Sequence, residues 1–446
     1  MKYQIITYGC QFNETDSERI ANILEKIEYR PASKINEADL VVINMCSVRQ
    51  SAVDRIYGKI NQISKIRTQN NKLKIILSGC ILPEDKKKLE KKVDLILNIK
   101  DLANWPKILK KRIKPSLSFS FFPSCNFLNY LKIKPKYQNN FKAYIPISSG
   151  CNNFCSYCVV PYVRGSLICR DPEEILEEIK EVIKKGFKEI WLLGQNVNHY
   201  SSKRINFEKL LKMANEIDGD FWIRFTSPHP ADFSDGLIKT IAQCKKVTPY
   251  LHLPVQSGDN EILKKMNRNY TIEKYKEIIK KIRKAFIVAR EGLEKEISLS
   301  TDVIVGFPGE REEQFKKTLK LFKEIKYDMA YIARYSPRSG TTAAKLKDEI
   351  TSGEKKRRWR ILTNLLKKIS LEKNKKYLNK IIEVLPEERK KEWLIGKTRH
   401  YKTIKFSIPD FQSKFPKLFS QIIKVRVVNV STWGLKGKII DNLIHN

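Results

Sequence analysis

The sequence predicts an α/β protein with an N-terminal parallel-sheet domain, a central partial barrel of βα units and a small all-β barrel at its C-terminal end. Three observations lead to this prediction. Short apolar strand patterns alternate with amphipathic helical patterns up to about residue 100, and the alternation resumes between about residues 143 and 350. After residue 371 the helical pattern gives way to short strand patterns in close succession. Strand–helix alternation is typical of parallel sheets, whereas closely spaced short strands indicate a sandwich or barrel.

The composition indicates a multidomain protein with a polyanionic partner. The 446 residues suffice for about three domains of ordinary size, and 41% of them are hydrophobic. Lys and Arg outnumber Asp and Glu by 86 to 49, which gives a formal net charge of +37. A surface this positive favours nucleic acid as a partner. The alternative explanation is a genome-wide compositional bias, since Lys, Ile and Asn are abundant along the whole chain.

The sequence further predicts a cytoplasmic protein that does not associate with a membrane. No stretch approaches the roughly 20 apolar residues of a membrane span. Residues 1–7 lack the charged and apolar regions that open a secretion signal. The nine cysteines are therefore expected to serve as ligands or reactive thiols rather than disulfides.

Residues 1–115 are predicted to form the N-terminal domain, in which three strands each end near a cysteine. The strand patterns are 5–8, 40–44 and 75–78, separated by helical patterns at 17–27 and 53–66. Cys10, Cys46 and Cys80 follow these strands directly. Because the carboxyl ends of parallel strands share one edge, where ligand sites form, the three thiols are expected to meet and hold an iron–sulfur cluster. The alternative is three unrelated core cysteines, since free Cys is commonly buried.

Residues 116–142 are predicted to be a basic linker between the first two domains. Basic residues precede and follow an aromatic stretch here. The aromatic residues are Phe119, Phe121, Phe122, Phe127 and Tyr130. The aromatic side chains are expected either to pack between two domains or to stack on RNA bases while the lysines bind phosphates. Cys125 in this stretch has no partner motif.

Residues 143–370 are predicted to form a partial TIM-type (β/α)6 barrel. The strand patterns are 143–148, 189–195, 221–226, 250–255, 297–306 and 327–335, and the helical patterns among them include 172–185, 207–217, 272–286 and 312–325. Barrels of this type carry their chemistry at the carboxyl ends of the strands.

Three cysteines, Cys151, Cys155 and Cys158, follow the first barrel strand at C-x3-C-x2-C spacing. Thiolates suit iron–sulfur clusters, zinc or copper(I). Three thiolates on a four-iron cluster leave one iron open, whereas a structural zinc site usually closes with four ligands. No fourth Cys or His stands at finger spacing nearby. The spacing therefore predicts a [4Fe–4S] cluster with an open iron, and the alternatives are a zinc knuckle or buried thiols without a ligand.

Polar residues and glycines follow other barrel strands, where they are predicted to form a joint cofactor site. They are Gln195, Asn196 and Asn198 after the second strand, Gln256 and Ser257 after the fourth, and Gly306 and Glu310 after the fifth. Singly, each is ordinary turn chemistry. Their common position at the carboxyl ends of the strands is what predicts the site.

Residues 371–442 are predicted to form the small all-β barrel. A basic helical pattern at 355–376 leads to strand patterns at 381–385, 393–398, 403–406, 422–430 and 437–440. Small basic barrels often bind RNA through strand faces and loops. The alternative is a solvated barrel that makes no RNA contact.

Several motifs resemble the radical S-adenosylmethionine (SAM) methylthiotransferase family. The cysteine triplet with an aromatic residue, Tyr157, before its last cysteine is similar to the radical SAM motif, and its continuation is typical of the methylthiotransferases: Val159-Val160-Pro161-Tyr162-Val163-Arg164-Gly165. Residues 7–18 resemble the family's opening motif, and residues 44–49 its second cysteine motif. Residues 193–198 resemble the tRNA-modifying branch, and the C-terminal barrel resembles a TRAM domain.

The resemblance implies two [4Fe–4S] clusters and SAM as cofactors. Cys151, Cys155 and Cys158 would hold the cluster at which SAM is cleaved to a 5′-deoxyadenosyl radical, and Cys10, Cys46 and Cys80 would hold the auxiliary cluster that supplies sulfur. The residues expected to contact SAM are Tyr157, Gln195, Asn196, Asn198, Gln256, Ser257, Gly306 and Glu310.

The implied reaction is methylthiolation of isopentenyladenosine next to the anticodon of tRNA. The expected partners are this tRNA and a small electron-transfer protein of flavodoxin or ferredoxin type, and a monomer is expected. The alternatives are a sibling methylthiotransferase that acts on threonylcarbamoyl-adenosine in tRNA or on a ribosomal protein, and a non-catalytic RNA-binding protein that contains metal.

Overall fold

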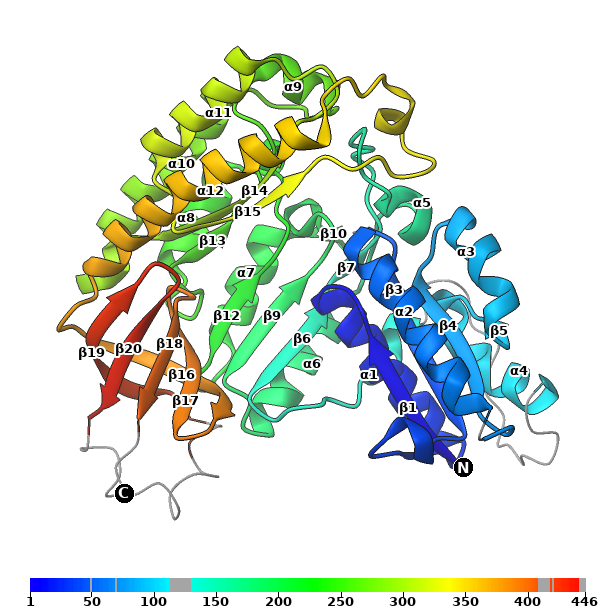
Figure 1. Cartoon of the computed structure of the whole chain (residues 1–446). Helices are drawn as coiled ribbons and strands as arrows, with labels where there is room; N and C mark the ends of the chain where they lie inside the picture. Colours follow the sequence, from blue (N-terminus) through cyan, green and yellow to red (C-terminus); the bar gives the residue numbers. More distant parts are fainter. Residues whose placement is uncertain (49, 69, 113–129, 408–417, 419–420, 441–446) are drawn as a thin grey trace. The chain divides into compact units, whose positions relative to one another are not determined.

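The computed structural model describes residues 1–48, 50–68, 70–112, 130–407, 418 and 421–440 (Figure 1). The chain forms two compact units. The first comprises Met1–Gln138, Ser148–Arg170 and Ser336–Ala344, and the second comprises Asn139–Ile147, Asp171–Tyr335 and the chain from Lys345 on. The segment with the cysteine triplet is thus grouped with the N-terminal sheet, whereas the sequence-based division puts it in the barrel domain; the domain boundaries stay a prediction.

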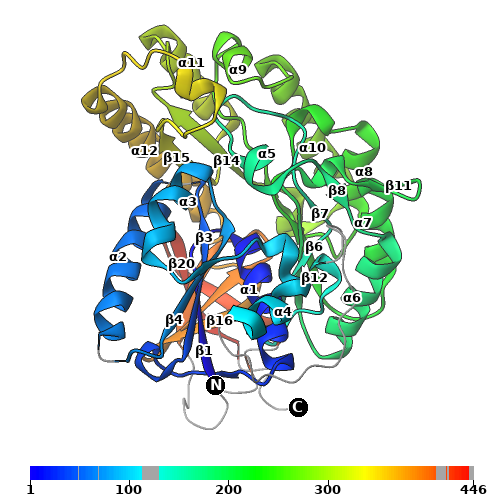
Figure 2. The same cartoon turned by 90° about the vertical axis from the view of Figure 1, so that its right-hand side faces the viewer.

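A five-stranded parallel sheet forms the centre of the first unit (Figure 2). Its strand order is β2 (Arg30–Pro31), β1 (Lys2–Thr7), β3 (Leu40–Cys46), β4 (Lys74–Cys80) and β5 (Leu95–Ile96). Its helices are α1 (Gln11–Lys26), α2 (Gln50–Arg67), α3 (Pro83–Leu89) and α4 (Trp105–Arg112). Strand β3 is buried along its whole length, as its continuous apolar sequence predicts for a central parallel strand. The predicted parallel-sheet domain is confirmed.

Helix α1 begins earlier than its sequence pattern indicates. The predicted helix starts at Ser17, whereas the observed one starts at Gln11, directly after Cys10. The first turn is polar and so lacks the apolar periodicity of the rest, but it is capped: the backbone N–H of Cys10 donates to Oδ1 of Asn13 (3.3 Å). This cap fixes Cys10 at the helix N-terminus.

Six parallel strands and their helices form the partial barrel of the second unit. The strands are β6 (Lys142–Pro146), β9 (Glu189–Leu193), β12 (Trp222–Phe225), β13 (Tyr250–His252), β14 (Ser298–Val305) and β15 (Met329–Arg334). They pair in two three-stranded sheets, and a parallel bridge from Ile223 to Val247 continues the pairing between them. The accompanying helices are α6 (Pro172–Lys184), α7 (Phe207–Glu216), α8 (Asp235–Gln243), α9 (Asn260–Lys265), α10 (Ile272–Ala289) and α11 (Glu312–Ile325). The predicted (β/α)6 architecture is confirmed.

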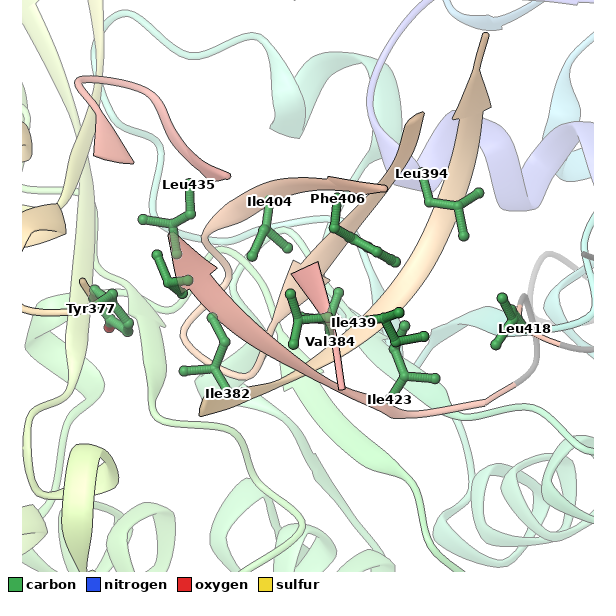
Figure 3. Close-up of a cluster of buried hydrophobic side chains, with 12 residues drawn as sticks. Tyr377, Ile382, Val384, Leu394, Ile404, Phe406, Leu418, Ile423, Leu435 and Ile439 are labelled. Carbon is green, nitrogen blue, oxygen red and sulfur yellow. The ribbon is translucent and has the colours of Figure 1, made fainter. Parts of the chain in front are cut away.

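The C-terminal part is a closed barrel reached through the long helix α12 (Ser352–Lys375). Its strand order is β16 (Ile381–Lys390), β17 (Trp393–Thr398), β18 (Thr403–Ser407), β20 (Gly434–Ile439) and β19 (Ile423–Ser431). Figure 3 shows side chains of its core, among them Val384 on β16 and Ile404 and Phe406 on β18, all three of which are fully buried. The all-β barrel is therefore confirmed. Its first strand runs five residues beyond the predicted end, to Lys390, across a bulge between Pro386 and Glu388.

A buried arginine joins the two barrels of the second unit. Arg224 on β12 forms an ion pair with Glu189 on β9, and both side chains are fully buried. The guanidinium also donates to the carbonyl oxygens of Thr398 and Arg399, each at 2.8 Å. Its carbon lies 5.0 Å from the centre of the Tyr401 ring. These contacts attach the small barrel to the amino-terminal end of the barrel strands, away from their carboxyl ends.

The stretch predicted to link the first two domains falls largely outside the described residues, including Cys125 and the four phenylalanines at 119–127. Tyr130 and Leu131, which lie in the described half of this stretch, are buried and belong to the first unit. None of the helices within the described ranges combines the length and the apolar character needed to cross a bilayer.

Candidate functional site

The first candidate site lies at the carboxyl edge of the N-terminal sheet. Strands β3 and β4 run parallel with Cys46 opposite Cys80, so the two thiols are neighbours. Both are buried, and their side chains form a hydrogen bond. Cys10, at the start of α1, is exposed but lies close enough to influence both of the others electrostatically. The structure therefore brings the three predicted cysteines together.

The surroundings shift the pKa values of the three thiols in different directions. The hydrogen bond with Cys46, together with burial, raises the pKa of Cys80 well above its ordinary value. The same bond lowers the pKa of Cys46, because Cys80 donates to it. Loss of hydration and the nearby Cys80 raise the pKa of Cys10. A metal or cluster that binds here has to displace the proton of Cys80.

Two buried asparagines hold α1 against the end of β3. The side-chain nitrogen of Asn13 donates to Oδ1 of Asn44 and to the carbonyl oxygen of Met45, both at 3.2 Å. In return, the nitrogen of Asn44 donates to the carbonyl oxygen of Asn13 (2.8 Å). This exchange fixes Cys10 relative to Cys46. Both asparagines stand in the motifs quoted above, but the sequence alone does not indicate that they bind each other.

Glycine is required beside Cys80. Gly79 has φ = +102°, and a Cβ atom there would lie 2.3 Å from the carbonyl oxygen of Met45 and 2.4 Å from Oδ1 of Asn44. Strands β3 and β4 thus approach each other closely where they end.

The second candidate site is the loop that contains Cys151, Cys155 and Cys158. It follows β7 (Ser148–Ser149), which pairs with β8 (Ile168–Cys169), and the N–H of Cys151 donates to the carbonyl oxygen of Gly165 (3.1 Å). Cys155 is buried and the other two thiols are half-buried. The three cysteines therefore lie in one loop, and their binding of a cluster stays a prediction.

Both trios consist of thiols, the donor groups that bind iron–sulfur clusters. Within the described ranges, no three Cys, His, Asp or Glu side chains are arranged to hold one metal ion. In a four-iron cluster each thiolate binds a different iron, so the sulfur atoms need not converge on one point. Thiolates are soft ligands, and six of them in two trios fit the chemistry of iron–sulfur clusters.

Two exposed aromatic side chains stand beside the triplet loop. Phe154 and Tyr162 are 53% and 52% exposed, and their ring centres are 6.5 Å apart in an edge-to-face arrangement. Phe154 has φ = +45°, a conformation that is unfavourable for a residue with a side chain of this size. Sequence analysis did not single out either aromatic ring.

The residues predicted to contact SAM follow the barrel strands, except Tyr157, which lies in the triplet loop; two of the others already form hydrogen bonds within the protein. Asn198 exchanges two hydrogen bonds with the backbone of His229, at 2.7 and 3.0 Å. Glu310 accepts from the N–H of Gly306 (2.6 Å) and from Arg358 (2.8 Å). These two side chains therefore stabilise the loops, and their contact with SAM stays a prediction.

Other predicted contact residues are less engaged in hydrogen bonds within the protein than Asn198 and Glu310. The nitrogen of Asn196 donates to Asp232 (2.7 Å), while its buried Oδ1 has no hydrogen-bond partner among the described residues. Gln256 has φ = +67° after β13, where its backbone bonds to Asp302 and Ile304 on β14. Ser257 is buried and accepts from the N–H of Asp259 (3.3 Å). Tyr157 and Gln195 are half-buried.

Comparison with known proteins places this chain among two described families. Residues 145–322 match the family described as Radical SAM superfamily, and residues 2–98 match the one described as Uncharacterized protein family UPF0004. A solved radical S-adenosylmethionine methyltransferase, TsrM from Kitasatospora setae, shares the fold with a TM-score of 0.54 and 12% identity over 77% of each chain.

Two curated relatives are similar over almost their whole length. The tRNA-2-methylthio-N(6)-dimethylallyladenosine synthase of Alkaliphilus oremlandii is 39% identical over 99% of this chain and 93% of its own. The protein of the same name from Clostridium botulinum is 40% identical over 98% of this chain and 97% of its own. The chain therefore belongs to the MiaB-like family of radical SAM methylthiotransferases.

Proposed function

We propose that this protein is a tRNA-2-methylthio-N(6)-dimethylallyladenosine synthase, which adds a methylthio group to isopentenyladenosine next to the anticodon. The observation that carries the proposal is the presence of two separate trios of cysteines in one compact unit, one at the edge of a parallel sheet and one in a closed loop. The full-length similarity to synthases of this name supports the choice of substrate.

The chain's part in the reaction is to hold the cofactors and limit access of water. When bound, two [4Fe–4S] clusters and SAM supply the radical chemistry, the sulfur and the methyl group. Cys151, Cys155 and Cys158 would hold the cluster that binds SAM, and three protein ligands leave its fourth iron for that purpose. Cys10, Cys46 and Cys80 would hold the auxiliary cluster. Burial of Cys46 and Cys80 shields this second site on the side of the sheet.

For SAM itself, the best-supported contact is Asn196. Its buried Oδ1 is an acceptor in need of a donor, and the ammonium group of SAM offers one. Gln195, Gln256 and Ser257 follow strands β9 and β13 and would contribute further polar contacts. Gly306, with φ = +70°, leaves room for close approach to the backbone. Tyr157 stays a proposed contact on the basis of the family motif.

The C-terminal barrel offers a surface for tRNA, here called the Trp393 face. It comprises Trp393 on β17, Lys405 on β18, Lys436 and Lys438 on β20 and Arg426 on β19. Lys405 stands directly opposite Lys436, and Lys438 opposite Arg426. Like charges placed opposite each other repel, so the arrangement favours a polyanionic ligand.

The aromatic ring of this face lies among the cations. The amines of Lys405 and Lys436 are 5.3 and 4.7 Å from the centre of the Trp393 ring. Proteins that bind single-stranded RNA stack its bases on aromatic rings and bind its phosphates with basic side chains. We therefore propose that the Trp393 face contacts tRNA.

We further propose that the protein is a cytoplasmic monomer. Its electron donor would be a protein of flavodoxin or ferredoxin type.

The test uses anaerobically reconstituted protein, SAM, a reductant and anticodon stem–loop RNA. One RNA carries isopentenyladenosine and the other threonylcarbamoyl-adenosine, and the products are analysed by liquid chromatography and mass spectrometry. We expect a methylthio group on the first RNA only. Modification of the second RNA alone would assign the protein to the sibling activity, and no SAM cleavage with either RNA would favour a non-catalytic RNA-binding protein.

A further inference from the structure

Arg164 extends from the radical SAM motif segment to the auxiliary cysteines. It is the last residue of α5 (Val160–Arg164), the short helix that follows the triplet loop. Its side chain is only 3% exposed. Nε donates to Sγ of Cys80 at 3.0 Å. A single segment of chain thus carries the three cysteines of one site and a cation that contacts the other.

Three further side chains contact the guanidinium of Arg164. Nη2 forms an ion pair with Oδ2 of Asp16 at 2.7 Å, and Nη1 donates to the hydroxyl of Tyr130 at 3.2 Å. The ring of Phe12 lies below it, with its centre 4.4 Å from the guanidinium carbon. Asp16 and Phe12 both belong to α1, the helix that begins after Cys10. The position of the charge is therefore fixed relative to the sheet edge.

The hydrogen-bonding pattern is unusual for a purely structural ion pair. A buried arginine satisfies a carboxylate best through two parallel hydrogen bonds. Here only one oxygen of Asp16 is used, and its Oδ1 is buried without a partner among the described residues. The second donor, Nε, is directed at sulfur instead. Buried ion pairs seldom add net stability over apolar packing, so this arrangement indicates a role at the sulfur site.

We propose that Arg164 is a positioning residue of the auxiliary cluster, which orients Cys80 and tunes the reduction potential of the cluster through a fixed positive charge and an N–H···S hydrogen bond. This inference rests on the proposed function in that Cys10, Cys46 and Cys80 hold a cluster. Net charge and hydrogen bonds to sulfur are main determinants of such potentials. A cation near the sulfur atoms favours the reduced, more negative state, so its loss lowers the potential.

The experiment isolates the auxiliary cluster by replacing Cys151, Cys155 and Cys158 with Ala in the full chain. In this background Arg164 is changed to Gln, which removes the charge, or to Lys, which keeps a charge but not the Nε donor. Arg290→Gln is the matched control, because Arg290 is also buried but belongs to the second unit, where it donates to the carbonyl oxygens of Ala242 and Val247. Iron and sulfide counts, the midpoint potential and the melting temperature of the metal-free protein are measured.

We expect Arg164→Gln to keep a cluster whose midpoint potential is shifted to more negative values, Arg164→Lys to show a smaller shift in the same direction, and Arg290→Gln to show none. Equal potentials in the parent and the Gln variant, with equal iron, would overturn the inference. If the Gln variant does not load iron, the Lys variant decides, and an unchanged potential there overturns it too. Absence of iron from the parent background would instead refute the proposed cluster site itself, so the two failures are distinguishable.

Discussion

The six cysteines acquire their neighbours from the pairing of short segments. Cys46 and Cys80 are adjacent because β3 and β4 run in parallel register up to their last residues. Cys10 joins them through the cap of α1 and the asparagine exchange. The triplet cysteines lie within one short segment, where the N–H of Cys151 donates to the carbonyl oxygen of Gly165. Two trios built so differently are expected to have separable roles.

Single substitutions test this separation. Cys155→Ala should abolish reductive cleavage of SAM, because the cluster that binds SAM loses one of its three ligands. Cys46→Ala should allow cleavage to 5′-deoxyadenosine but block sulfur insertion. Both are measured by liquid chromatography and mass spectrometry on reconstituted protein. Identical phenotypes for the two variants would contradict the assigned roles.

Alanine substitutions at two glycines test the close approach of β4 to β3 beside Cys80. Gly79→Ala forces a Cβ into the carbonyl oxygen of Met45 at a positive φ, which should cost about 1–3 kcal/mol and reduce auxiliary iron. Gly58→Ala on α2, where no atom lies within 4 Å of the new Cβ, should be neutral or stabilise by about 1 kcal/mol. Denaturant unfolding and iron counts check both. A Gly79→Ala variant as stable and as fully loaded as the Gly58 variant would disprove the requirement.

Residue roles were the least predictable from sequence. The six cysteines were found because their spacing and their position after strands are visible in a linear pattern. Arg164 was quoted within a motif but not assigned, because a basic residue on a short helix is ordinarily solvated. The bonds of Asn198 to His229 and of Glu310 to Arg358 join residues far apart in the sequence, and no local pattern indicates them.

The helices and strands, by contrast, were largely predictable. The six barrel strands are rich in apolar and aromatic residues and have turn residues near their ends, and each lies within a few residues of its predicted range. The start of α1 was missed because its first turn is polar and its cap is a cysteine. Strand β16 was predicted too short because its second half, after Pro386, is charged and no longer alternates.

The junction between the two barrels of the second unit contains a buried histidine. Burial lowers the pKa of His400 to about 4, and its Nε2 donates to the carbonyl oxygen of Leu293 (3.1 Å). The ring also lies edge-to-face with Tyr377, at 5.6 Å between centres. In the unfolded chain this histidine titrates near its ordinary value of about 6.5.

Since the unfolded state binds the proton first, stability should fall as the pH drops below about 6.5 and should continue to fall until about pH 4. The contribution of His400 is about 2 kcal/mol between roughly pH 7.5 and pH 5. Urea unfolding of His400→Asn should show a correspondingly smaller pH dependence than the unsubstituted protein. Equal pH dependence in the two proteins would contradict the assignment.

For the whole molecule, the positions of the basic residues say more about the partner than the net charge does. The formal net charge of +37 does not by itself identify a partner, because lysines are spread over the whole chain. The registers of β18, β19 and β20 collect four cations and Trp393 on one barrel face. This local concentration, rather than the total, is expected to govern tRNA binding.

The Trp393 face is tested by its salt dependence. Lys405→Gln with Lys436→Gln should reduce the slope of log affinity against log salt concentration by about two, because two phosphate contacts are lost. Trp393→Ala should cost about 1–3 kcal/mol of binding free energy. Lys280→Gln with Lys284→Gln, which changes two exposed lysines on α10, is the control with matched charge. The same loss of slope in the control would attribute binding to overall charge alone.

The central claim is that each trio of cysteines holds its own four-iron cluster, and iron and sulfide counts after anaerobic reconstitution test it most directly. The unsubstituted chain should contain about eight iron and about eight sulfide, and about four of each should remain when either trio is replaced by Ala. Stoichiometric zinc, or about four iron in the unsubstituted chain with no loss on replacing Cys10, Cys46 and Cys80, would contradict it.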